Sequence, residues 1–75
     1  KTVQISLNSI GKVKSFVNAI SQFEYDFDLI SGRYVIDAKS IMGIFSLDLS
    51  KPIILEAHTD DASEFFAKIK QYIVD

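Results

Sequence analysis

The sequence predicts an α+β fold, an open-faced two-layer β-sandwich in which a four-stranded, mainly antiparallel sheet is covered by three helices on one face. Two short segments alternate apolar and polar residues, which is the period of a half-buried strand, and two others are short β-rich runs. Three further segments carry an apolar face at helical spacing. These segments follow the order β-α-β-β-α-β-α, without a repeat, linker or low-complexity segment. Because each strand has one apolar side, we expect one sheet face to pack against the helices and the other to meet water.

The first half of the chain predicts a strand, a helix and a hairpin. Alternation over residues 2–7 predicts the first strand, whose apolar side consists of Val3, Ile5 and Leu7. Apolar residues at i, i+3, i+4 and i+7 predict an amphipathic helix over residues 11–22. Alternating residues over 25–29, a turn at Ser31-Gly32 and a β-rich segment over 34–36 together predict a hairpin.

The second half predicts two helices separated by a strand. Ser40 precedes a short apolar run and is expected to cap a helix of two or three turns, a cap that typically contributes about 1 kcal/mol. Lys51-Pro52 ends the connection, and Ile53–Ala57 forms the fourth strand. Asp61, three residues before Glu64, is expected to cap a last amphipathic helix that runs to the C-terminus. Its apolar face comprises Phe65, Phe66, Ile69, Tyr72 and Ile73.

Size and composition narrow the classes of protein to which the chain can belong. A chain of 75 residues builds one small core, so we expect a single domain over residues 1–75 and no catalytic cleft between domains. The absence of cysteine excludes disulfides and thiolate metal sites, which fits a reducing, cytoplasmic location. A net charge of −2 argues against a nucleic-acid partner, and the sequence has no apolar run of the roughly 20 residues that a membrane span needs.

The titratable residues predict neither an enzyme nor a cofactor or metal site. His58 is the only histidine, and we expect it to be an exposed loop residue just after the fourth strand. Without a second histidine or a cysteine, no metal-ligand pattern is present in the sequence. Asp26 and Asp28 alternate onto the expected solvent face of a strand, where we interpret them as edge protection and a source of solubility.

The segment KSIMGIFSL, residues 39–47, and the order of the elements resemble HPr, the histidine-containing phosphocarrier family of the bacterial sugar phosphotransferase system. The resemblance extends along the whole chain. It is strongest over residues 39–43 with Ser46-Leu47 behind them, which are similar to the regulatory-serine region of HPr from low-GC Gram-positive bacteria. Ala57, Asp60 or Asp61, and Ala62 resemble the turn of the family into its final helix.

The sequence departs from the family at the start of the first helix. Members carry Gly, an aliphatic residue, His, a small residue, Arg, Pro and Ala there, and the imidazole accepts phosphate from Enzyme I. Alignment on Phe16-Val17 places Ser9 at the histidine position and Gly11 at the arginine position, and none of the seven positions matches. A serine hydroxyl without a base is a weak nucleophile, and its phosphate ester is a poor donor. In this respect the chain is similar to the catabolite-repression HPr homologue.

The resemblance also gives Ser40 a regulatory role. Phosphorylation there would add nearly two negative charges beside an expected partner-binding surface, and Gly43 is expected to leave that surface open for close approach. Ile44 and Leu47 are expected in the core. The partner-binding surface comprises Lys39, Ile41, Met42 and Phe45. In the family such a surface docks Enzyme I, the HPr kinase/phosphorylase and a repressor-type transcription regulator.

Together these features predict a non-catalytic HPr-like regulatory or binding protein that is related to the sugar phosphotransferase system and phosphorylated at Ser40. Two alternatives stay open. One is a phosphocarrier that uses a non-standard acceptor, and the other is a structural or interaction module without phosphorylation. Labelling by Enzyme I would identify the first alternative, and phosphorylation competence at Ser40 separates the leading hypothesis from the second.

Overall fold

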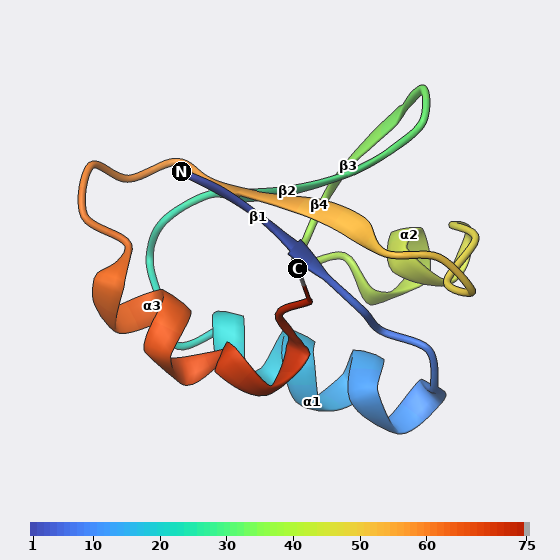
Figure 1. Cartoon of the computed structure of the whole chain (residues 1–75), viewed down its shortest axis with the longest axis horizontal. Coiled ribbons are helices and arrows are strands. Elements are labelled where there is room, and N and C mark those ends of the chain that lie inside the picture. The colour runs from blue at the N-terminus through green and yellow to red at the C-terminus, as the bar shows by residue number, and fades with distance from the viewer. Residues whose placement is uncertain (75) are drawn as a thin grey trace.

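The computed structural model describes residues 1–74 and confirms the predicted element order and fold class. The elements are β1 (Thr2–Ile5), α1 (Ile10–Ile20), β2 (Phe27–Ser31), β3 (Tyr34–Asp37), α2 (Ile41–Phe45), β4 (Ile53–Ala57), α3 (Ser63–Lys68) and the 3-10 helix η1 (Lys70–Tyr72). The strands pair antiparallel in the order β1-β4-β2-β3, and all three α-helices lie on one side of the sheet (Figure 1). Within residues 1–74, every helix is too short or too polar to span a bilayer.

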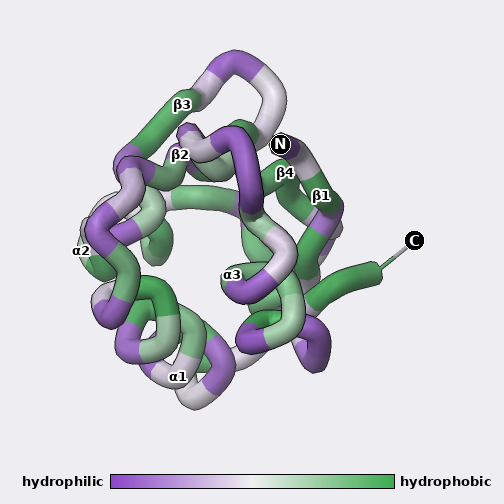
Figure 2. Tube along the Cα trace, turned by 90° about the vertical axis from the view of Figure 1, so that its left-hand side faces the viewer, coloured by the Kyte–Doolittle hydropathy of each residue, from purple (hydrophilic) through white to green (hydrophobic). Residues whose placement is uncertain are grey.

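The core lies between the sheet and the helices, and the strands and helices form two layers in Figure 2. Most inward-facing residues predicted from strand alternation are buried, among them Ile5, Phe27 and Leu29, whereas Val3 is half-buried and Tyr25 is exposed. Aromatic side chains join the layers, since Phe65 of α3 stacks on Phe27 with ring centroids 4.3 Å apart. Burial of these apolar faces is the main term that stabilises so small a protein.

The observed element boundaries differ from the predicted ones by a few residues. β1 ends at Ile5 because the Ser6 N–H donates to the Tyr72 carbonyl, at 2.8 Å, rather than to β4. Helix α1 begins and ends earlier than predicted, and the hairpin begins at Phe27. Helix α2 has only five residues, so the prediction of two or three turns was wrong.

The prediction of a helix up to the C-terminus was also wrong. Helix α3 ends at Lys68, and after η1 the chain becomes extended at Ile73, which forms an antiparallel bridge with Ile5. The Val74 N–H donates to the Gln4 carbonyl at 2.9 Å. The C-terminal segment therefore forms hydrogen bonds with backbone groups on the side of β1 that β4 leaves unpaired. These bonds hold the segment in an extended conformation, although its apolar spacing predicts a helix.

The strand order changes the interpretation of the acidic residues in β2. β2 lies between β4 and β3, so Asp28 is on an interior strand of the sheet and the prediction that it protects an edge was wrong. Asp28 lies opposite Asp37 on one side and opposite Glu56 on the other. The open face of the sheet therefore carries a row of carboxylates, which sequence alternation alone did not reveal.

Candidate functional site

Ser9 is the N-cap of helix α1. Its backbone is extended, with φ −149° and ψ 157°, and its hydroxyl oxygen accepts the Lys12 backbone N–H at 3.2 Å. A shallow hollow of about 350 Å³ adjoins it, lined by Ser9, Gly11, Lys12, Ser15, Gln71 and Tyr72. None of these lining residues is a carboxylate or an imidazole that would act as a general base for the Ser9 hydroxyl.

His58 is far from this hollow along the sheet. β4 is antiparallel to β1, and the register pairs Thr2 with Glu56 and Ile5 with Ile53. The residue after β4 therefore lies beside the start of β1, whereas Ser9 follows the other end of that strand (Figure 1). The only histidine of the chain is thus too distant to activate the Ser9 hydroxyl.

Ser40 caps helix α2, as the sequence predicts. Its exposed hydroxyl accepts the Gly43 backbone N–H at a long 3.4 Å, and its carbonyl accepts the Ile44 N–H at 3.0 Å. Gly43 does not leave a surface open for a partner, contrary to the prediction. A Cβ atom there would lie 3.2 Å from the Ser40 hydroxyl and 3.4 Å from the Ile36 side chain, so the glycine makes room for the cap and the sheet.

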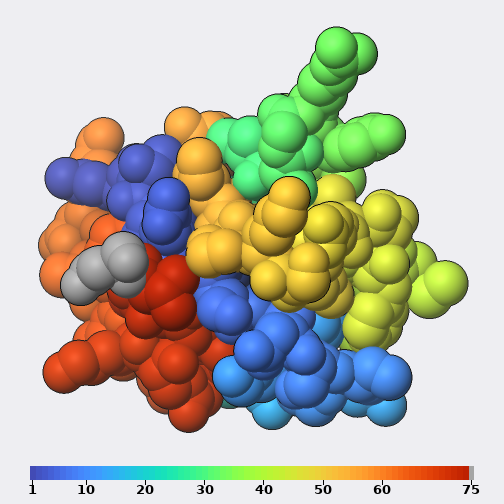
Figure 3. All heavy atoms as spheres, turned by 45° about the vertical axis from the view of Figure 1, so that its right-hand side comes forward, coloured from blue at the N-terminus to red at the C-terminus, as the bar shows by residue number. Residues whose placement is uncertain are grey.

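The apolar residues of α2 divide between the core and the surface. Ile44 and Leu47 are buried, as predicted. Met42 is 78% exposed and Phe45 is 39% exposed, whereas Ile41 is half-buried against the core. In Figure 3 the yellow-green segment that contains α2 lies above the blue segment of α1, at the edge of the molecule. A partner-binding role for Met42 and Phe45 stays a prediction.

Lys39 is tied to the fold by several contacts. Its ammonium group donates to the Phe23 carbonyl at 2.8 Å and lies 5.6 Å from the centroid of the Phe27 ring. Its backbone N–H donates to the Asp37 carboxylate at 2.9 Å. These contacts hold the connection between β3 and α2 and so position Ser40. Partner binding by Lys39 stays a prediction, and it would require the ammonium group to leave the Phe23 carbonyl.

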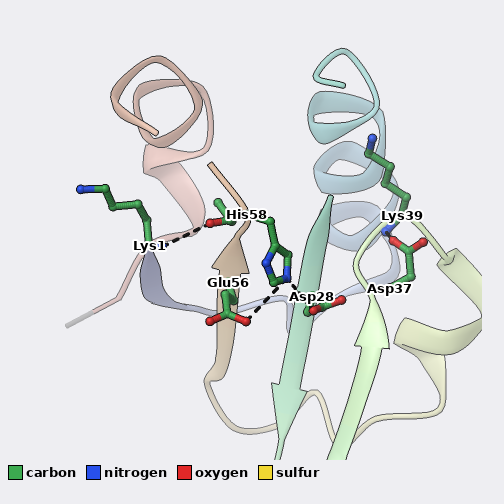
Figure 4. Close-up of polar contacts among 7 residues, drawn as sticks. Lys1, Asp28, Asp37, Lys39, Glu56 and His58 are labelled. Atoms are coloured by element: carbon green, nitrogen blue, oxygen red, sulfur yellow. Dashed lines mark hydrogen bonds and ion pairs between the residues drawn. The ribbon is translucent and has the colours of Figure 1, made fainter. Parts of the chain in front are cut away.

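The structure brings together a second group of polar side chains that the sequence pattern did not reveal. Asp28 of β2, Glu56 of β4 and His58 converge on the open face of the sheet, and Figure 4 shows His58 between the two carboxylates. The His58 Nε2 atom lies 2.7 Å from Asp28 Oδ2 and 3.6 Å from Glu56 Oε1. The prediction of an exposed loop histidine after the fourth strand is confirmed, but it did not include these contacts. The spacing of Glu56 and His58 shows that they share a face, but only the pairing of β4 with β2 brings Asp28 to them.

The carboxylates alter the acid–base behaviour of His58. The hydrogen bond to Asp28 raises the pKa of His58 above its usual value of 6.5, and the negative charges of Asp28, Glu56 and Asp26 act in the same direction. Desolvation acts in the opposite direction and is smaller than the effect of the hydrogen bond. The protonated imidazole is therefore favoured here more than in a free histidine.

The open-faced sandwich, with Ser9 and Ser40 each at the start of a helix, places the chain in the class of small α+β proteins with an HPr-like fold. A family model described as the PTS HPr component phosphorylation site matches residues 12–75, and the chain belongs to this PTS-HPr family. Members of this family are phosphocarriers rather than enzymes, and they interact with phosphotransferase-system proteins such as Enzyme I. The match begins at Lys12, three residues after Ser9.

Solved structures of HPr proteins share this fold. HPr-C-His from Thermoanaerobacter tengcongensis superposes with a TM-score of 0.78 at 28% identity, covering 95% of this chain and 88% of that chain. The phosphocarrier protein HPr from Bacillus anthracis has a TM-score of 0.72 at 28% identity, covering 99% and 94% of the two chains. The histidine-containing phosphocarrier protein of Mycoplasma, at 21% identity, has a TM-score of 0.71 over 95% of this chain and 86% of that chain, which shows the fold alone. A search of curated protein sequences finds no significant match.

Proposed function

We propose that this chain is a non-catalytic regulatory or binding protein of the phosphotransferase system, in which Ser9 stands where the phosphocarrier histidine of the family stands. The observation that carries the proposal is the position of the Ser9 hydroxyl, which caps α1 at 3.2 Å from the Lys12 N–H and has no base among its lining neighbours. Serine in this setting satisfies a helix N-terminus but supplies no activated nucleophile for phosphoryl relay.

The second part of the proposal is regulation by phosphorylation at Ser40. Its hydroxyl is exposed and bound to the Gly43 N–H only at 3.4 Å, so a kinase would displace a weak contact to reach it. A phosphate would place nearly two negative charges beside Met42 and Phe45, which are the exposed apolar residues of α2. The change would act on partner affinity through charge at this surface, in the manner of the catabolite-repression HPr homologue.

The proposed partners are proteins that bind the exposed surface of α2. They are an HPr kinase/phosphorylase, a transcription regulator or an Enzyme I-like surface, and the proposed contact residues are Lys39, Ile41, Met42 and Phe45. The exposure of Met42 supports this assignment, because an exposed flexible thioether adapts to several apolar partners. The half-buried Ile41 would contribute only its exposed part.

The test is phosphorylation of the intact chain by HPr kinase/phosphorylase with ATP, followed by intact-mass measurement. We expect one added phosphate on the wild type and none on Ser40→Ala. Ser46→Ala is the matched control, because Ser46 flanks the other end of α2 and its hydroxyl donates to the Gly43 carbonyl. Loss of the phosphate in Ser46→Ala but not in Ser40→Ala, or no phosphate on the wild type, would contradict the regulatory role.

The alternative of a phosphocarrier with a different acceptor is tested separately. Enzyme I with phosphoenolpyruvate would have to label the chain with an acid-labile, base-stable phosphate. His58 is the one imidazole in the sequence, and it lies between Asp28 and Glu56, whose charges repel phosphoryl oxygens. We therefore expect no such label, and a label that disappears in His58→Gln would replace our proposal with this alternative.

A further inference from the structure

The open face of the sheet carries three carboxylates at directly opposite positions on three neighbouring strands. Asp28 of β2 pairs in register with Asp37 of β3 and with Glu56 of β4, so the three side chains share one face. Like charges directly opposite each other in a sheet destabilise it. A cation among these side chains, either the protonated imidazole of His58 or a bound metal ion, reduces that repulsion.

Lysine and arginine do not supply that cation in the described part of the chain. Within residues 1–74, the only ion pairs that Asp28 and Glu56 make are those with His58. Lys39, the basic residue that follows β3, directs its ammonium group to the Phe23 carbonyl instead. Figure 4 shows the Lys39 side chain extending away from the Asp28 and Glu56 carboxylates.

The three side chains offer ligand atoms that are close enough together to bind one metal ion. One ligand atom each of Asp28, Glu56 and His58 lies within 4.8 Å of the others. In a tetrahedral zinc site the ligand atoms are about 3.4 Å apart, given metal bonds of about 2.0–2.2 Å. The 3.6 Å between His58 Nε2 and Glu56 Oε1 meets this spacing, and the 2.7 Å contact with Asp28 needs a small outward rotation.

The backbone that carries these ligands is held by the sheet, and the side chains are accessible. Asp28 and Glu56 are paired residues of the two interior strands, and the His58 N–H donates to the Asp26 carbonyl at 2.9 Å. The side chains of His58, Asp28 and Glu56 are 46%, 33% and 38% exposed, so an ion can reach them without unfolding. Asp37 lies beside Asp28 and adds negative charge next to the ligands.

We propose that Asp28, Glu56 and His58 form a binding site for a divalent first-row transition-metal ion, with Zn²⁺ as the representative ion. One imidazole nitrogen and two carboxylate oxygens are ligands that Zn²⁺ accepts, and the fourth position is open to water. Mg²⁺ and Ca²⁺ prefer all-oxygen sites and are not expected to bind. The ion replaces the proton that His58 and Asp28 share, because the coordinating imidazole must be neutral.

The test is titration of the whole chain with Zn²⁺ by calorimetry, combined with NMR of the His58 imidazole. We expect saturable binding that shifts the ring resonances, with Mg²⁺ and Ca²⁺ giving no shift. His58→Gln and Asp28→Asn are each expected to weaken binding by at least about tenfold, the lower end of the loss seen even for outer-shell partners. Circular dichroism of both variants shows whether the fold is retained.

Asp60→Asn is the matched control, because it removes the same charge as Asp28→Asn from an exposed position outside the cluster. We expect it to leave the affinity for Zn²⁺ unchanged. If Asp60→Asn and Asp28→Asn weakened Zn²⁺ binding equally, the binding would be diffuse electrostatic attraction and the proposed site would be wrong. Binding of Mg²⁺ with the same affinity as Zn²⁺ would also contradict the proposed site. Zn²⁺ binding at this site does not involve Ser9 or Ser40, so its outcome does not depend on the proposed function.

Discussion

His58 Nε2 lies 2.7 Å from Asp28 Oδ2, a contact between side chains 30 positions apart that joins the residue after β4 to β2 on the open face of the sheet. Glu56, which pairs with Asp28 in register, is 3.6 Å from the same imidazole nitrogen. Histidine is the residue whose charge changes most readily near neutral pH. This contact therefore couples the stability of the sheet to pH and, by our proposal, to metal ions.

The stability contributed by His58 is expected to fall as pH rises. Because its pKa in the folded chain lies above the usual 6.5, the contribution is fully present below that value and is lost as pH rises through the folded pKa. Asp28, Glu56 and Asp26 all favour the protonated form of the ring, and Asp37 lines the same hollow as His58. Urea unfolding of the wild type and His58→Gln between about pH 5 and 8.5, with a chelator present, measures this difference. A difference that stays constant over this range contradicts the prediction.

The Ser9 cap of α1 can be tested against a serine in the middle of the same helix. Ser9→Ala removes the acceptor of the Lys12 N–H and should lower the free energy of unfolding by about 0.5–2 kcal/mol. Ser15→Ala is the control, because Ser15 is an exposed residue inside α1 and alanine there raises helix propensity. Chemical unfolding should give opposite signs for the two variants, and equal effects would show that Ser9 is not acting as a cap.

The two helical glycines are expected to respond differently to alanine. Around Gly11, an added Cβ would meet no atom within 4 Å, so Gly11→Ala should stabilise the chain by about 0.5–1 kcal/mol. At Gly43 the same atom would crowd the Ser40 hydroxyl and Ile36, so Gly43→Ala should give less stability than Gly11→Ala. Thermal unfolding compares the two, and an equal gain at both positions would show that the contacts at Gly43 relax freely.

The division of α2 between core and surface predicts separate effects on folding and on binding. Ile44→Ala should cost about 2–5 kcal/mol of stability, because Ile44 is fully buried. Met42→Ala should leave stability nearly unchanged, because Met42 is 78% exposed, and should weaken binding of a partner to the α2 surface. Urea unfolding and a pull-down with Enzyme I measure the two effects. A large loss of stability in Met42→Ala would place that side chain in the core.

The proposed loss of phosphocarrier chemistry predicts a gain of function. Replacing Ser9 by His and Gly11 by Arg supplies the imidazole acceptor and the phosphate-binding guanidinium that the family carries at the start of its first helix. We expect this double variant to accept phosphate from Enzyme I and phosphoenolpyruvate, whereas the wild type does not. Acid lability of the label identifies phosphohistidine, and His58→Gln in the same background shows which imidazole carries it. Labelling of the wild type would refute the proposed role of Ser9.

Much of the fold was predictable because it rests on local periodicity. The alternation around Ile5 and Leu29 and the helical spacing around Phe16 identified buried side chains correctly, since burial of an apolar face depends on the same spacing that the sequence displays. The Ser40 cap was also predictable, because an N-cap bond joins residues only three positions apart. No local sequence pattern of this kind predicts what the α2 surface binds.

The sequence by itself determined which segments become strands and helices and which side of each is apolar, because those properties arise from neighbours along the chain. Only the tertiary structure decided that β2 is interior, that Ile73 returns to Ile5, and that Asp28 meets His58. Strand order and register bring together residues that are distant in the sequence. The free energy that selects them is the packing of the whole core, which no short segment displays.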